Sequence, residues 1–271
     1  MIFYVGPLRS PMIELPDFAC TGAYELVDEG ISGGKRNWHI RVLADSEILF
    51  SKLYTAIDVC AVGGGGGGST YVYGQASGAG GGGGYVATKS NVKPTIGQKY
   101  NIYIGQGGNA APLNGNRGGT TAGFSCSAAG GYGGNGYAGG NGGSGGGAAG
   151  AGANGTSGAG GSNGGNGGNG TGVTGATGGN GSGTPTTAFY GLAGDIGDST
   201  LYGAGGAGAR VYYPNSQNGG ATGGGSVTNG VGGNGQPNTG AGGSGSGKND
   251  ESVSAGNGGS GIFIIRNHRT A

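Results

Sequence analysis

Residues 130–145 read Gly130-Gly-Tyr-Gly-Gly-Asn-Gly-Tyr-Ala-Gly-Gly-Asn-Gly-Gly-Ser-Gly145, with glycine at every third position. The same period returns at residues 152–170 and again at 172–181. The stretch from 118 to 194, which contains all three runs, has no Asp, Glu, Lys, Arg or His. Neither the period of an amphipathic helix nor the alternation of a strand can be read in it. The structure of this uncharged stretch therefore decides the fold.

Three structures can be weighed for the glycine runs. Collagen also has period three, but it needs proline in the intervening positions, and Pro185 is the only proline between Pro112 and Pro214. Disorder is typical of glycine-rich chains that lack a period. Here the period is kept, both flanks read as strands, and tyrosines are interspersed. The sequence favours polyglycine II helices, with three residues per turn, packed side by side so that their backbones hydrogen-bond to one another.

The composition limits both the core and the function. Of 271 residues 80 are glycine, 33% are hydrophobic and 9% are charged, so a hydrophobic core can use only part of the chain. A net charge of +1 gives no electrostatic footprint for nucleic acid. Cys20, Cys60 and Cys126 have no metal-binding spacing and are expected to be buried free thiols. We expect no membrane insertion, because no run approaches the roughly 20 apolar residues of a membrane span. We expect no secretory signal, because residues 1–7 lack a basic segment and an uninterrupted apolar one.

Short strands are expected on both sides of the glycine runs. Trp38, Ile40 and Val42 alternate with polar residues, Tyr100, Ile102 and Ile104 do the same, and Ile262-Phe-Ile-Ile265 is apolar enough to be a central closing strand. Residues 94–97 read as a turn. The predicted fold is all-β: a small jelly-roll-like β-sandwich that carries a lattice of polyglycine II helices, with essentially no α-helix.

The chain divides into three predicted parts. Residues 1–34 read as an N-terminal docking arm, because Ile2, Phe3, Tyr4 and Val5 are costly to leave in water. Residues 35–108 together with 256–271 form the β-sandwich. Residues 109–255 form the glycine-rich region, whose period is interrupted by loops.

Two stretches resemble a known family. Ala56-Ile-Asp-Val-Cys-Ala-Val-Gly-Gly-Gly-Gly-Gly-Gly68 and Ile96-Gly-Gln-Lys-Tyr-Asn-Ile-Tyr-Ile-Gly-Gln-Gly-Gly108 are similar to the glycine-rich domain of phage tail and tail-fibre proteins, as is the ending at 258–266. The middle of the chain matches by composition only. A similar arrangement occurs in a vertebrate receptor tyrosine kinase, where glycine helices are inserted into a jelly roll. T-even-type phage adhesins stack polyglycine helices, and their distal loops bind host receptors. Residues 1–37 do not match the cap of those adhesins.

Signatures of catalysis are weak. The G-x-G-x-x-G match after Val59 lacks the helix and the acidic residue that nucleotide binding needs, and the P-loop-like run at 242–248 is followed by Asn249 instead of Ser or Thr. Asp195 and Asp198 can be read as calcium ligands, but a polar loop is the preferred reading. We therefore predict no catalytic residue, no metal and no cofactor.

The loops that break the glycine period are the candidate binding sites. They are rich in tyrosine, asparagine and arginine, a composition typical of binding surfaces held on a rigid scaffold. The candidate receptor-binding residues are Phe189, Tyr190, Asp195, Asp198, Tyr202, Arg210, Tyr212, Tyr213 and Asn215. The alternative is that these side chains cap the lattice. Smaller loops lie at 69–73 and 111–117.

These features lead to one functional expectation and two alternatives. The resemblance implies a non-catalytic phage tail-tip or tail-fibre adhesin in the virion that binds a polysaccharide or protein of the host surface. Ile2, Phe3, Tyr4 and Val5 would then contact other tail or fibre proteins. The alternatives are a structural tail or baseplate component, such as a tip cap, and a glycine-rich protein of a bacterial surface or spore coat. Oligomerisation is compatible with each.

Overall fold

A computed structural model describes residues 4–5, 17–32, 35–52, 56–70, 77–149, 158–160, 189, 200–209, 216, 218–220, 223–247 and 253–267. These residues form strands and extended segments, and no helix occurs among them. The strands are β1 (Tyr4–Val5), β2 (Phe18–Cys20), β3 (Tyr24–Ser32), β4 (Lys35–Val42), β5 (Ser46–Phe50), β6 (Ile57–Val62), β7 (Ser69–Thr70), β8 (Val86–Val92), β9 (Lys99–Ile102), β10 (Ala111–Pro112), β11 (Thr121–Gly123), β12 (Cys126–Ala128), β13 (Val227–Thr228), β14 (Val231–Gly232) and β15 (Ile262–Arg266). The all-β prediction is confirmed.

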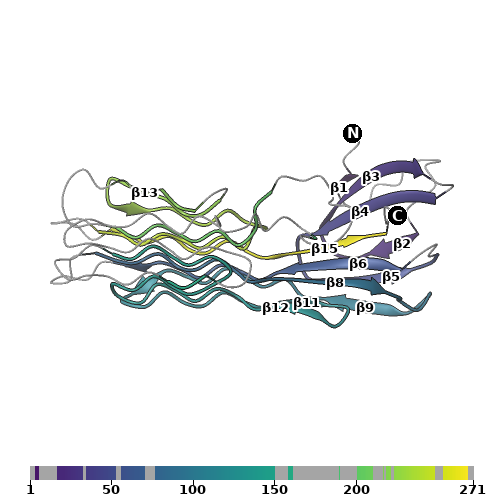
Figure 1. The fold of residues 1–271 in the computed structure, drawn as a ribbon, viewed down its shortest axis with the longest axis horizontal. Helices are drawn as coiled ribbons and strands as arrows, with labels where there is room; N and C mark the ends of the chain where they lie inside the picture. Colours follow the sequence, from purple (N-terminus) through teal and green to yellow (C-terminus); the bar gives the residue numbers. More distant parts are fainter. Residues whose placement is uncertain are drawn as a thin grey trace.

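The molecule is elongated, with the longer strands at one end and the glycine segments at the other (Figure 1). The strand end holds a six-stranded antiparallel sheet in the order β1-β3-β4-β15-β6-β8 and a three-stranded sheet in the order β2-β5-β9. Side chains of both sheets meet in one core cluster, which includes Trp38, Ile40, Phe50, Ile102 and Phe263. This packing is the β-sandwich that the sequence predicted.

Strand β15 is central, as its composition predicted. It pairs with β4 on one side and β6 on the other, and all five of its residues are buried. Phe263 and Ile265 point into the core between the sheets, whereas Ile262 and Ile264 belong to a second apolar cluster. Because both faces are covered, the strand shows a continuous apolar run instead of alternation.

The predicted boundary of the docking arm at residue 34 is wrong. Strand β2 pairs with β5, and β3 pairs with β4 along its whole length, so residues 18–32 belong to the sandwich. The ring centroids of Phe18 and Trp38 lie 4.8 Å apart, and this packing buries Phe18. Tyr4 and Val5 form β1 along β3, and Ile2 and Phe3 lie outside the described residues. The residues of β3, Tyr24-Glu-Leu-Val-Asp-Glu-Gly-Ile-Ser32, lack a regular alternation of apolar and polar side chains, which concealed this strand in the sequence.

A hairpin within the uncharged stretch also belongs to the sandwich. Strands β11 and β12 are joined by Phe124 and Ser125, which have φ of 51° and 55°, as in a type I′ turn. Positive φ is uncommon for a bulky residue, and here the core holds it. The Phe124 ring stacks on Tyr100 at 4.7 Å and lies 6.1 Å from Phe50. The boundary of the sandwich at residue 108 is therefore also wrong.

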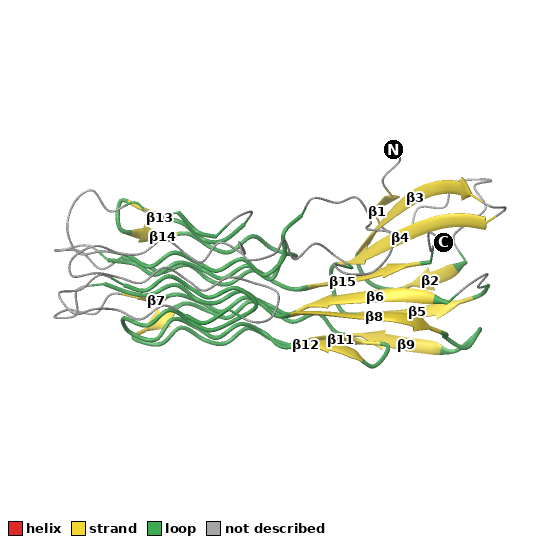
Figure 2. Cartoon of the chain, viewed as in Figure 1, coloured by secondary structure: helices red, strands yellow, loops and turns green. Residues whose placement is uncertain are grey.

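The glycine segments continue the strands of the sandwich (Figure 2). Residues 63–68 follow β6, residues 80–85 lead into β8, and residues 253–261 lead into β15. The glycine-rich part of the chain therefore leaves the sandwich at the end of one strand and re-enters it at the start of another. The described glycine-rich segments run parallel and antiparallel to one another beside the sandwich. Together they form what we call the glycine-rich body (63–70, 77–85, 105–119, 129–149, 203–209, 223–247 and 253–261).

Residues 63–68 show how these segments are joined. Their successive backbone N–H groups donate to three different segments in turn, and the order of acceptors then repeats. The bonds run from Gly63 to Tyr85, Gly64 to Gly119, Gly65 to Gly259, Gly66 to Gly82, Gly67 to Asn116 and Gly68 to Gly256, at 2.8–3.0 Å between N and O. Every third N–H group therefore points toward the same neighbouring segment. A helix with three residues per turn produces this repeat.

The carbonyl groups of residues 64–69 accept from three further segments. The donors are Gly131 and Gly134, Gly108 and Ala111, and Gly243 and Ser246. Among the described residues this stretch is therefore hydrogen-bonded on all sides, and its peptide groups are paired although they are buried. These are the bonds that the predicted lattice requires. The polyglycine II conformation itself stays a prediction.

The glycine period has a steric cause where it is described. Gly130 and Gly133 both face the segment at 115–118, and a Cβ at either would overlap the carbonyl oxygen of Gly118 or Gly115. The run does not continue straight to Gly145, because the chain turns at 135–138, where Gly136 has φ of 54°. The second and third glycine runs, at 152–170 and 172–181, lie outside the described residues apart from 158–160.

The three cysteines are free thiols, and two of them allow a test of the packing. Cys126 is buried and Cys20 partly buried, and burial raises the pKa of both thiols because it disfavours the charged thiolate. We expect iodoacetamide at about pH 8 to modify both about tenfold or more slowly in the native protein than in guanidinium chloride, since the thiolate is the nucleophile. Peptide mass spectrometry over time measures these rates. Equal native and denatured rates would contradict the packing of β2 and β12.

Candidate functional site

Two of the candidate receptor-binding residues, Phe189 and Tyr202, are buried. Each is 1% exposed. They pack on the outer face of the six-stranded sheet, in a cluster with Cys60, Val62, Ile262 and Ile264. Their assignment to a receptor-contacting surface is therefore wrong, because a buried ring cannot touch a ligand. Sequence reasoning could not separate an exposed tyrosine from one that covers a sheet.

Two arginines of the sheet hold these rings. The Arg266 guanidinium lies 4.4 Å from the centroid of the Phe189 ring, and its Nε and Nη2 donate to Oδ2 of Asp58 at 3.1 and 3.0 Å. Arg41 Nη2 donates to the hydroxyl of Tyr202 at 2.7 Å and to Thr200 at 3.4 Å. The Asp58–Arg266 pair is buried on both sides. These contacts hold Phe189, Thr200 and Tyr202 against the sandwich.

The other predicted receptor-binding residues lie outside the part of the chain that the structure describes. They are Tyr190, Asp195, Asp198, Arg210, Tyr212, Tyr213 and Asn215. Their assignment stays a prediction.

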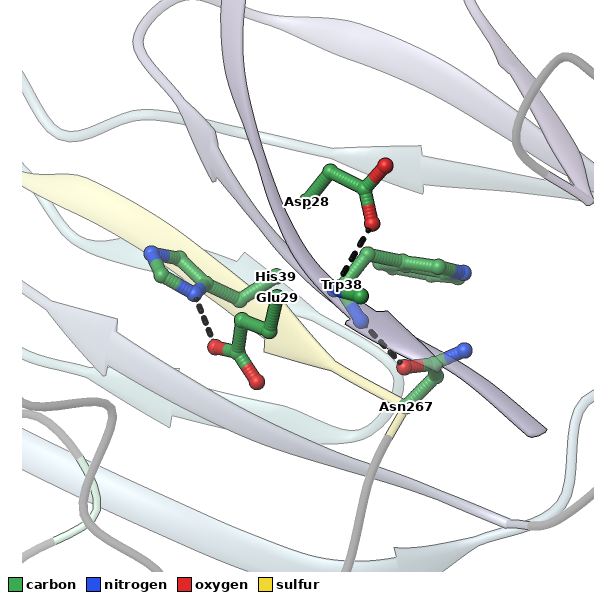
Figure 3. Close-up of polar contacts among 6 residues, drawn as sticks. Asp28, Glu29, Trp38, His39 and Asn267 are labelled. Atoms are coloured by element: carbon green, nitrogen blue, oxygen red, sulfur yellow. Dashed lines mark hydrogen bonds and ion pairs between the residues drawn. The ribbon is translucent and has the colours of Figure 1, made fainter. Parts of the chain in front are cut away.

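A polar cluster joins β3, β4 and the end of β15 (Figure 3). The backbone N–H of Trp38 donates to Oδ1 of Asn267 at 2.8 Å, and Nδ1 of His39 lies 2.7 Å from Oε1 of Glu29. A β-bulge between Asp28 and Gly30 leaves Glu29 outside the strand register, which brings its carboxylate against His39. The His39–Glu29 pair connects neighbouring strands, and we assign it a structural role.

Within the described ranges, no three His, Cys, Asp or Glu side chains converge as metal ligands would. The same ranges contain no helix with the length and apolar character needed to cross a bilayer.

The described part of the glycine-rich body that lies farthest from the sandwich carries short strands and turns (Figure 2). There β7 pairs with β10, and β13 pairs with β14 across Asn229 and Gly230, whose φ values of 49° and 82° fit a type I′ turn. Leu113 and Val231 are 48% and 50% exposed at this distal end. Sequence reasoning named the loop at 111–117 but missed Val231. The Asn-Gly pair between two valines was a usable hairpin signal.

The flank of the body carries a second exposed feature. The Arg117 guanidinium carbon lies 4.2 Å from the centroid of the Tyr132 ring, and Nε of Arg117 donates to the carbonyl of Gly130 at 3.1 Å. Tyr132 is 46% exposed. The candidate site thus consists of two exposed surfaces, the distal turns and the Arg117–Tyr132 flank.

The comparisons with known proteins agree with this architecture. A family model described as a glycine-rich domain matches residues 46–268, from β5 through the glycine-rich body to the end of β15. Among curated proteins, none matches the chain. Since the family match spans most of the 271 residues, the chain belongs to the glycine-rich domain family.

Proposed function

We propose that the protein is a receptor-binding component of a phage tail tip or tail fibre, which attaches the virion to the host surface without catalysis. The proposal rests on one observation, that the sandwich and the exposed turns of the glycine-rich body lie far apart along the molecule. Strands β1 and β15, which lie nearest the chain ends, are both in the sandwich, whereas β7, β13 and β14 lie toward the opposite end (Figure 2). Exposed Leu113 follows β10, which pairs with β7, and exposed Val231 lies in β14. A protein that bridges two partners benefits from this arrangement.

Each end has a proposed partner. The sandwich end, with β1 and the residues before it, would bind other tail or fibre proteins, so the protein would be located in the virion. The distal turns would contact a polysaccharide or protein of the host surface. Backbone hydrogen bonds fix the segments that support these turns, and a rigid support lowers the entropy lost when a loop binds.

A second candidate function is a structural tail or baseplate component, such as a tip cap. It is favoured by the burial of Phe189 and Tyr202, which removes two aromatic rings from the surface available for recognition. Under this function the glycine-rich body would serve as a rigid part without a receptor.

Adsorption to cells separates the two candidates. We expect the purified protein to bind cells of a susceptible host, and the Leu113→Asn/Val231→Thr variant to bind about tenfold or more weakly, because it removes the exposed apolar surface of the distal turns. Asn suits position 113, where φ is 63°, and Thr keeps the β-branched side chain of β14. Flow cytometry with labelled protein measures binding.

The matched control is Ile96→Thr. Ile96 is 50% exposed and lies in the turn between β8 and β9 at the sandwich end, so this variant should bind cells as the wild type does. If the wild type binds no cell type from which the phage can be grown but binds tail proteins, the structural function replaces the receptor-binding one.

A further inference from the structure

Arg117 is an isolated charge on an uncharged surface. It is the only Asp, Glu, Lys, Arg or His between Lys99 and Asp195 in the sequence. Within the described segments of the glycine-rich body, it is also the only charged side chain. The Arg117 side chain is exposed. Among the described residues Arg117 forms no ion pair, so its charge keeps its attraction for an external anion.

Its orientation is fixed by the neighbouring segment. Segments 115–119 and 130–134 are joined by bonds from Gly118 N to Gly131 O at 2.9 Å and from Gly115 N to Gly134 O at 2.8 Å. These bonds place Arg117 beside Tyr132, where the bond from Arg117 Nε to the Gly130 carbonyl and the stacking on the ring hold the guanidinium. Among the described residues, neither Nη group of Arg117 makes a hydrogen bond. A held guanidinium loses less side-chain entropy on binding than a free lysine would.

The surroundings offer neutral hydrogen-bonding groups. Asn114 and Asn135 form a backbone bridge, and the N–H of Tyr132 donates to the carbonyl of Asn141 at 2.8 Å, so all three asparagines lie on segments that adjoin Arg117 or Tyr132. Their side chains are exposed. Each amide both donates and accepts, which suits the hydroxyl groups of a sugar.

We propose that the Arg117–Tyr132 surface binds a carboxylated polysaccharide of the host cell surface. The planar guanidinium pairs with a planar carboxylate through parallel N–H···O bonds, the exposed part of Tyr132 covers the apolar side of a sugar ring, and the amides bind hydroxyls. The single cation of this surface, Arg117, can pair with the one carboxylate that each sugar of such a polymer carries. A phosphate group has further oxygens to satisfy, and the described surface offers no second cation for them. That the polymer belongs to a host cell rests on the proposed receptor-binding function. Its carboxylated chemistry is argued from Arg117 and Tyr132 alone.

Binding to a uronic acid polymer tests the surface directly. We expect the full chain to bind immobilised polygalacturonate but not dextran, in a salt-dependent manner, since screening weakens exposed charge pairs. Arg117→Gln should weaken binding about fivefold or more, and Arg117→Lys should fall between, because it keeps the charge but loses the planar fork. Tyr132→Ala should weaken binding as well. Biolayer interferometry at two salt concentrations measures all four proteins.

The control variant is Lys93→Gln, which changes the net charge by the same amount at the sandwich end, where Lys93 is exposed. It should bind as the wild type does. Thermal unfolding checks that the variants remain folded. Equal binding of wild-type protein to polygalacturonate and dextran, or equal binding by the wild type and Arg117→Gln, would overturn the proposal. Stronger binding to a glycerol phosphate polymer would also overturn it.

Cell adsorption distinguishes this proposal from the proposed function. If wild-type protein adsorbs to host cells and Arg117→Gln adsorbs equally well, the flank site is wrong and the receptor-binding function stands. If Arg117-dependent binding to polygalacturonate is found but no host cell is bound, the flank site stands and the receptor-binding function is wrong.

Discussion

Replacing Gly67 with alanine is expected to lower the free energy of unfolding by about 3 kcal/mol or more. A Cβ at this position would overlap the carbonyl group of Asn109 in the adjacent segment. Relief requires the two backbones to separate, which stretches the bonds that join these segments, from Gly108 N to Gly65 O and from Ala111 N to Gly68 O. A backbone fixed on all sides cannot yield as a flexible side chain can.

The matched control is Asn109→Ala, on the other side of the same contact. The Asn109 side chain is exposed, and its carbonyl group, which accepts from Asn116, is unchanged by the substitution. This variant should unfold within about 0.5 kcal/mol of the wild type. Thermal and urea unfolding followed by circular dichroism measure both differences. Equal stability of the two variants would show that the glycine segments are not in close backbone contact.

Asp58→Asn is the second substitution with a large expected effect. It keeps the oxygen that accepts from the backbone N–H of Asn91 at 2.9 Å, but it removes the negative charge bound to buried Arg266. Removing one partner of a buried ion pair costs roughly 3–5 kcal/mol, because the remaining charge is poorly compensated. We expect a loss of this size, measured by urea unfolding.

The double variant Asp58→Leu/Arg266→Met provides the control. Replacing both charges by apolar side chains of similar length leaves no buried charge, so stability should recover to within about 1–2 kcal/mol of the wild type. A double variant as unstable as Asp58→Asn would mean that other contacts of these side chains, such as the stacking of Arg266 on Phe189, dominate.

The sequence predicted those parts of the fold whose residue pattern has a single physical cause. Alternation at Trp38, Ile40 and Val42 indicated a strand with one face in the core, and the unbroken apolar run of β15 indicated a central strand. The glycine period indicated backbones in close contact, and Gly130 and Gly133 meet neighbouring carbonyl groups as expected. In each case the local pattern alone indicates whether the segment packs against side chains of the core or against another backbone.

The rest depends on partners distant in sequence. Phe124 is a lone aromatic among small residues, and its positive φ is tolerated only because Tyr100 and Phe50 surround it. Tyr202 and Phe189 have the composition of a binding loop, yet they cover the sheet because Arg41 and Arg266 face them. The Arg117–Tyr132 contact was likewise invisible, since it depends on which two glycine segments are adjacent.

The two ends of the molecule bury different kinds of surface, and this has a thermal consequence. The sandwich buries aliphatic and aromatic side chains, whose exposure on unfolding raises the heat capacity, whereas the glycine-rich body buries mainly peptide groups, whose exposure lowers it. The stability of the sandwich therefore passes through a maximum and declines in the cold. Because the glycine-rich body buries little apolar side-chain surface, we expect its stability to vary with temperature with less curvature than that of the sandwich.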